Sequence, residues 1–110
     1  MPFYLFQGSY TTAAIKAMVE NPQDREGPAR AVIEAAGGKL HHFFFAFGKD
    51  DIVCLLEAPD DTAVAAVALA VGAGGALSSG RTTRLMSARE AKDAMTAAKA
   101  ASASYEPPAG

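Results

Sequence analysis

The residues that could do chemistry in this chain are few, and most lie in its first half. Tyr4, Tyr10, His41 and His42 carry groups that can donate, accept or transfer protons. His41 and His42 are adjacent, so in a regular strand their side chains leave opposite faces and cannot ligate one metal together. Cys54 lies in the apolar run 52–56, where a thiol packs as a small hydrophobe. We therefore expect at most one histidine in any one site.

The acidic pairs and the glycine-rich segment have structural explanations. Asp50-Asp51 and Asp60-Asp61 are placed as turn and helix N-cap residues. The segment 72–75 lacks the lysine and Ser/Thr pair of a phosphate-binding loop. No spacing of metal ligands and no set of nucleophile, base and oxyanion donors is present, so we name no catalytic residue. We expect no cofactor, with haem or metal ligation by one histidine left open as an alternative.

These residues must be positioned by a short series of strands and helices. Apolar and aromatic runs predict strands over 3–10, 39–47 and 52–57, and a fourth strand is expected in the second half of 76–86, which ends in Leu85-Met86. Helical spacing predicts helices over 12–20, from Gly27-Pro28 to Gly37-Gly38, and over 62–71. The first two of these helices are expected to form one bent or interrupted helix. Ser87 and Glu90 form a capping-box pattern that opens a last helix, 87–104.

This order of elements predicts an α+β fold. The series closes most simply as a ferredoxin-like βαββαβ antiparallel sheet, with two helices on one face and the C-terminal helix added. Its first and third strands are then central neighbours, and the strand with the two histidines lies at an edge. We expect one domain, 1–104, followed by a disordered tail, 105–110, that contains two prolines.

Composition narrows the classes of partner. The chain has 110 residues, half of them hydrophobic, a formal net charge of -2 and one cysteine. A single cysteine excludes a disulfide scaffold, and the mixed charges give no reason to expect nucleic acid or a membrane as a partner. The N-terminal residues lack the charged region of a secretory signal. We therefore expect a cytoplasmic protein.

Apolar side chains on both faces of the sheet predict self-association. Phe43, Phe44, Phe45 and Phe47 alternate between the faces, as do the residues of 3–6. Helices cover only one face, so a second copy is the economical cover for the other. We expect a homo-oligomer, most simply a dimer.

Several short motifs in a fixed order resemble the GYD family. They are Tyr4-Leu5-Phe6-Gln7-Gly8-Ser9-Tyr10-Thr11, Pro22 with Arg25, Ala35-Ala36-Gly37-Gly38-Lys39-Leu40, Glu57-Ala58-Pro59-Asp60-Asp61 and Arg81-Thr82-Thr83-Arg84-Leu85. The resemblance implies a fold of the dimeric α/β-barrel group, whose ferredoxin-like domains pair through their sheets. The triplet that names the family falls on Gly48-Lys49-Asp50, so its tyrosine is replaced here by Lys49.

Three functional hypotheses follow. The first is an oligomeric protein that binds a small apolar or aromatic molecule in a pocket lined by Tyr4, Phe6, Tyr10 and one of His41 or His42. The second is implied by the resemblance: an enzyme like the cofactor-independent monooxygenases or haem- and metal-handling proteins of that fold group. The third is a structural oligomer without a ligand. The residues favour the first.

Overall fold

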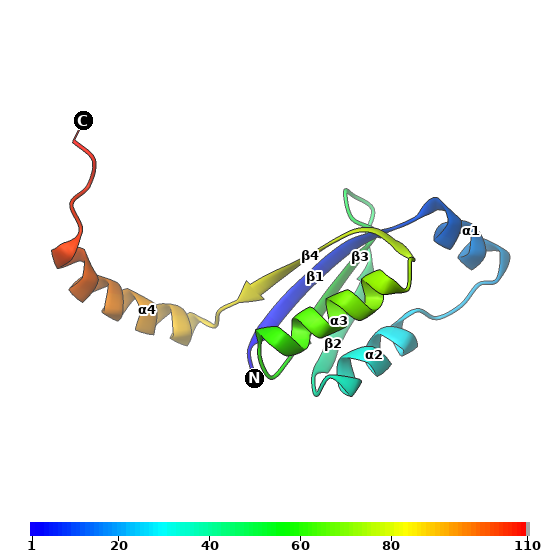
Figure 1. Cartoon of the computed structure of the whole chain (residues 1–110), viewed down its shortest axis with the longest axis horizontal. Coiled ribbons are helices and arrows are strands. Elements are labelled where there is room, and N and C mark those ends of the chain that lie inside the picture. Colours follow the sequence, from blue (N-terminus) through cyan, green and yellow to red (C-terminus); the bar gives the residue numbers. More distant parts are fainter. Residues whose placement is uncertain (110) are drawn as a thin grey trace.

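Four strands form one antiparallel sheet in the computed structural model, which describes residues 1–109. The strands lie in the order β2-β3-β1-β4, with bounds β1 (Phe3–Tyr10), β2 (Lys39–Phe45), β3 (Ile52–Glu57) and β4 (Leu77–Leu85). Helices α2 (Glu26–Ala35) and α3 (Asp61–Ala73) cover one face of the sheet (Figure 1). The predicted ferredoxin-like fold is confirmed, including the central pairing of β1 with β3 and the edge position of β2.

Side-chain oxygens cap three of the helices at their first turns, two of them at the cap residues expected from the sequence. Thr11 accepts a hydrogen bond from the backbone of Ala14 at the start of α1 (Thr12–Glu20), and Asp60 does the same for Ala63 at the start of α3. Ser87 and Glu90 make the full predicted capping box of α4 (Ala88–Ala101). Each cap satisfies an N–H group that the helix itself leaves without a partner.

Of the two expected forms, a bent or an interrupted helix, the structure has the interrupted one, with α1 and α2 as separate helices. Residues 21–25 connect α1 to α2, and Pro22 disfavours helical geometry at Asn21, where α1 is capped. Helix α1 lies beyond one end of the sheet and has no buried residue, whereas α2 buries Ile33 against the sheet (Figure 1). Among the helices of residues 1–109, α2 and α3 therefore build the covered face.

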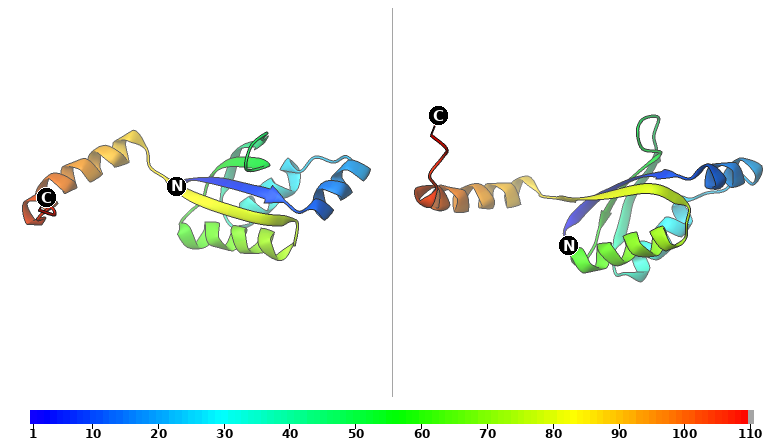
Figure 2. Two further views of the ribbon diagram at one scale, coloured as in Figure 1. Left: turned by 90° about the horizontal axis from the view of Figure 1, so that it is seen from above. Right: turned by 45° about the horizontal axis from the view of Figure 1, so that its top comes forward.

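Register and alternation determine which side chains face the helices. Phe6 pairs with Cys54 across β1 and β3, and Phe43 pairs with Cys54 across β2 and β3. The helix-facing set forms the core together with residues of α2 and α3, namely Tyr4, Ile33, Leu40, Cys54, Leu56, Ala58 and Val64. Alternate residues such as Leu5, Val53 and Leu55 point to the other face, which no helix covers (Figure 2).

Two glycines let the chain pass from α2 into β2. Gly37 has a φ of 85°, a left-handed conformation that favours glycine at a helix end. A Cβ atom on Gly38 would lie 2.5 Å from the carbonyl oxygen of Glu57 and 3.0 Å from a methyl group of Ile33. Gly38 is therefore needed where α2 and β3 approach each other.

Helix α4 extends away from the rest of the molecule. It leaves the end of β4, continues into a short 3-10 turn (Ser102–Ser104), and gives the chain a longest dimension of 60 Å (Figures 1 and 2). The expected tail, 105–110, ends on Gly110, which is outside the described residues, and its disorder stays a prediction. None of the helices in residues 1–109 has the length and hydropathy that crossing a membrane requires.

A pair of leucine substitutions tests this assignment of the core. Leu56 is buried among the sheet and helices, whereas Leu69 on α3 is 75% exposed. We expect Leu56→Ala to lower the free energy of unfolding by about 2–5 kcal/mol, because it removes buried methyl groups and leaves space behind. The matched control Leu69→Ala should change it by less than about 0.5 kcal/mol. Denaturant unfolding followed by circular dichroism measures both, and equal effects would contradict the assignment.

Candidate functional site

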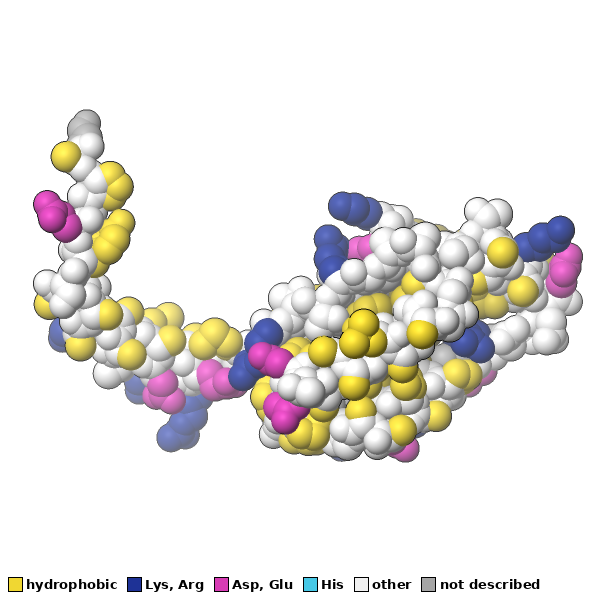
Figure 3. All heavy atoms as spheres, in the orientation of Figure 1, with side chains coloured by type: hydrophobic (Ala, Val, Ile, Leu, Met, Phe, Trp, Pro, Cys, Tyr) yellow, Lys and Arg dark blue, Asp and Glu magenta, His cyan; other side chains and the backbone are white. Residues whose placement is uncertain are grey.

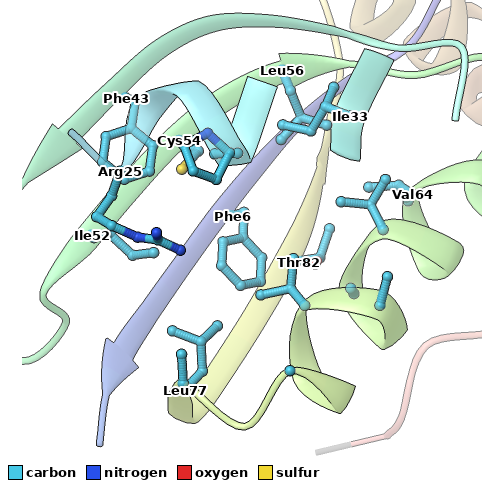
Figure 4. Close-up of a pocket in the computed structure, with 18 of the residues that line it drawn as sticks. Phe6, Arg25, Ile33, Phe43, Ile52, Cys54, Leu56, Val64, Leu77 and Thr82 are labelled. Carbon is cyan, nitrogen blue, oxygen red and sulfur yellow. The ribbon is translucent and has the colours of Figure 1, made fainter. Parts of the chain in front are cut away.

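A cavity of about 270 Å³ lies between the sheet and the two helices that cover it. The sheet contributes aromatic and aliphatic walls, and α2 and α3 contribute mainly small side chains (Figure 4). The lining comprises Phe6, Tyr10, Arg25, Pro28, Ala29, Ile33, Phe43, Ile52, Cys54, Leu56, Val64, Val67, Ala68, Ala70, Val71, Gly74, Ala76, Leu77 and Thr82. Exposed Pro28, Gly74 and Thr82 open it to solvent, and its mostly apolar lining offers water few polar partners.

Helix α2 places one charged side chain in this lining. Arg25, Ala29 and Ile33 follow one another at intervals of four residues, so they share one stripe of the helix. Arg25 is the N-cap residue of α2. Its guanidinium is directed toward Phe6 (Figure 4). Its Nη1 donates to the side-chain oxygen of Gln23 at 3.0 Å. Within residues 1–109 Arg25 forms no ion pair.

Tyr10 supplies a hydroxyl near the same guanidinium. Burial raises the pKa of Tyr10 above its ordinary value, and the positive charge of Arg25 opposes that rise. The backbone N–H of Tyr10 donates to the carboxylate of Asp51 at 2.9 Å, which fixes the end of β1. The neutral phenol can therefore donate a hydrogen bond into the cavity beside a permanent cation.

Cys54 lines the cavity as a neutral thiol. Burial raises its pKa to about 11, and the negative charge of Glu26 adds to the rise. The thiolate is the nucleophilic form of cysteine, and a thiol with this pKa is almost wholly protonated near neutral pH. Cys54 therefore acts here as an apolar wall, in agreement with its expected role in the core.

Of the five residues predicted to line the pocket, the structure brings Phe6 and Tyr10 to the cavity. Tyr4 is buried in the adjoining core, and its hydroxyl donates to Asp61 at 2.6 Å. That hydrogen bond, together with burial, raises the pKa of Tyr4. Tyr4 thus connects β1 to the first turn of α3 instead of lining the cavity.

Neither histidine reaches the cavity, because β2 contains a bulge. The register with β3 shifts between Leu40 and His42, so His41 and His42 together lie opposite Leu55. His41 contacts the carboxylate of Glu57, with Nε2 and Oε2 2.8 Å apart, and packs on Phe3. His42 stacks on Phe44. The expectation that the two imidazoles leave opposite faces is corrected: both lie on the face that the helices leave open.

The open face also holds the triplet at 48–50. Asp50 accepts a charged hydrogen bond from Arg81 at 2.7 Å, and Arg81 also donates to Gln7. Lys49 contributes only its backbone oxygen, which accepts from the Ser9 hydroxyl. The Asp50 carboxylate therefore holds the Arg81 side chain on the open face, beside Gln7 of β1. Within residues 1–109 no cluster of three or more His, Cys, Asp or Glu side chains could hold a metal ion.

Arg25 is the cavity residue that the analysis of single motifs missed. A signal for it was present, since the intervals of four residues from Arg25 through Ala29 to Ile33 match one face of a helix. The predicted start of that helix at Gly27-Pro28 placed Arg25 outside it. The structure begins α2 at Glu26, with Arg25 as its cap residue.

The buried thiol gives a direct test of the cavity wall. At about pH 8 we expect iodoacetamide to alkylate Cys54 in the native protein roughly 100-fold more slowly than in denaturant, because the raised pKa and burial both suppress the thiolate. Mass spectrometry of timed samples measures the two rates. Equally fast alkylation of native and unfolded chains would show that the thiol is accessible and ionised.

Comparison with known proteins agrees with this fold. The GYD domain family matches residues 4–102. The crystal structure of MtbAldR (Rv2779c) has a TM-score of 0.52 and 17% identity, over 78% of this chain and 52% of that one, so the chain spans about half the length of that protein. Protein Atu4242 from Agrobacterium tumefaciens has a TM-score of 0.52 and 16% identity, over 81% of this chain and 95% of that one. No curated protein matches. The family match covers most of the sequence, and the chain therefore belongs to the GYD domain family.

Proposed function

We propose that this protein binds a small apolar or aromatic molecule in the cavity between its sheet and helices α2 and α3. The observation that carries the proposal is the cavity itself, about 270 Å³ of space within an apolar lining. Small-molecule sites are typically concave and mostly hydrophobic, with a few polar groups that orient the ligand. Arg25, Tyr10 and Thr82 are such polar groups here.

The chemistry of the lining favours binding over catalysis. No imidazole lines the cavity, and its thiol has a pKa of about 11. The Tyr10 phenol is likewise neutral near neutral pH, and burial raises its pKa further. General acid–base or nucleophilic catalysis needs a group whose pKa suits the working pH. The cavity lining can therefore recognise a ligand by its shape and through the positive charge of Arg25.

We propose further that the protein acts as a homo-oligomer, most simply a dimer, in the cytoplasm. Apolar side chains on the open face support association through that face. They include Leu5, Val53, Leu55 and Phe44, and Phe44 is 59% exposed. Contiguous apolar surface of this kind is typical of protein–protein contacts. A second copy would also cover the two histidines.

Filling the cavity tests the ligand site. The probe is N-phenyl-1-naphthylamine, a neutral aromatic dye whose fluorescence rises in apolar surroundings. We expect the unmodified protein to bind it, and Ala68→Phe to weaken binding at least about tenfold, because the new ring would occupy the cavity. The matched control Ala66→Phe places the same ring on an exposed side of α3 and should bind as before. Equal binding by both variants would place the dye elsewhere.

A charge on the open face tests the oligomer. Phe44 pairs with Val53 on that face, so Phe44→Asp would bury an unpaired carboxylate in the proposed contact. We expect analytical ultracentrifugation to show a dimer for the unmodified protein and a monomer for Phe44→Asp at micromolar concentration. Leu69→Asp, which adds the same charge to exposed α3, should remain dimeric. A monomeric unmodified protein would refute the proposal.

A further inference from the structure

The single cation of the cavity has more hydrogen-bonding capacity than the protein uses. A guanidinium carries five N–H donors and is always charged. Among residues 1–109, its Nη1 donates to the side-chain oxygen of Gln23, and the guanidinium also lies within hydrogen-bonding reach of the Tyr10 hydroxyl. A cation beside an apolar space is costly unless a negative charge or several acceptors face it. Arg25 is half-buried, and the donors that these contacts leave are available to water or to an incoming anion.

The carboxylates at this end of the cavity are already engaged. Glu26, the next residue, pairs with Arg30 at 2.6 Å across one turn of α2. Asp51 accepts the backbone N–H of Tyr10. Neither group forms an ion pair with Arg25. Among residues 1–109 Arg25 therefore has no ion-pair partner that an incoming anion would have to displace.

Other polar groups of the lining are compatible with one negative charge. The phenol of Tyr10 is neutral and close to Arg25, so it can donate a second hydrogen bond to the same anion. Cys54 is protonated and adds no opposing charge. A single guanidinium balances a monoanion, whereas a phosphate ester would bring a second charge without a counter-ion into an apolar space.

The charged group of the cavity lies at one side. Arg25 lies beside Phe43 and Ile52, and the opposite side is bounded by Val64 on α3 (Figure 4). Leu56, Val67 and Val71 complete apolar walls without a second charged group. A ligand that matches this distribution has one charged end and an apolar body.

We infer that the cavity selects a small apolar carboxylic acid, an aromatic or short-chain aliphatic one, with its carboxylate held by Arg25 beside the Tyr10 hydroxyl. The inference rests on the proposed function and specifies its ligand class. A planar guanidinium can bind a carboxylate through two parallel hydrogen bonds, and such charged bonds are stronger than neutral ones. The charge gives selectivity, and the apolar walls give most of the contact area.

A matched pair of ligands tests the inference on the intact protein. 3-Phenylpropionate and 3-phenyl-1-propanol share their apolar body and differ in the charged end. Each is titrated against protein loaded with N-phenyl-1-naphthylamine at about pH 7.5, where the acid is ionised. We expect the acid to displace the dye at least about tenfold more tightly than the alcohol. Equal affinities, or a failure of the acid to displace bound dye, would overturn the inference and leave the proposed function standing.

Substitutions assign the selectivity to one residue. Arg25→Met should remove the advantage of the acid and leave the alcohol within about twofold of its original affinity. The control Arg30→Met removes a cation from the same helix that does not line the cavity, and should retain the preference for the acid. A preference that survives Arg25→Met would refute the role of Arg25. If the unmodified protein binds neither dye nor ligands, the proposed function itself fails, and that result needs no variant to fold.

Discussion

The alternation of side chains along β3 is the constraint on which the rest of the structure depends. Ile52, Cys54 and Leu56 point toward the helices, and the residues between them point away. Strand β3 has β1 as its neighbour on one side and β2 on the other. The register of these two pairings therefore sets which face of the sheet each side chain of β1 and β2 points to. A shift of one residue would exchange the two faces. The register of β3 therefore determines which side chains form the core, which line the cavity and which lie on the open face.

Small residues on the helices explain why the covered face contains a cavity instead of a filled core. Helix α3 meets the sheet through Val64, Val67 and several alanines, and α2 does so through Ala29 and Ile33. Alanine brings a helix close to the sheet without filling the space between neighbouring side chains. The view from the helix side also shows charged groups mainly at the edges of this layer (Figure 3). The polar groups of the lining are Arg25 before α2, Tyr10 at the end of β1 and Thr82 on β4.

Short sequence patterns predicted the order of strands and helices and two of the five expected pocket residues, Phe6 and Tyr10. Apolar and aromatic runs located β1, β2 and β3, and Asp60 and Ser87 located the starts of α3 and α4, because each signal acts over a few adjacent residues. The fourth strand, expected in the second half of 76–86, spans nearly the whole segment as β4 (Leu77–Leu85). The order of elements then leaves few ways to close a sheet. The positions of the histidines could not be derived this way, because a bulge depends on pairing with another strand. The cavity depends on packing between distant segments, and so the part played by Arg25 was missed as well.

The bulge in β2 has a consequence for how much the length of this strand can vary. Since His41 and His42 share one position opposite Leu55, removal of either residue would restore a regular ladder. Phe43 and the residues after it would keep their pairing with β3 and their faces. The same deletion within β3 would turn half of that strand over. A one-residue gap in an alignment of related chains can therefore fall at this pair while the cavity keeps its walls.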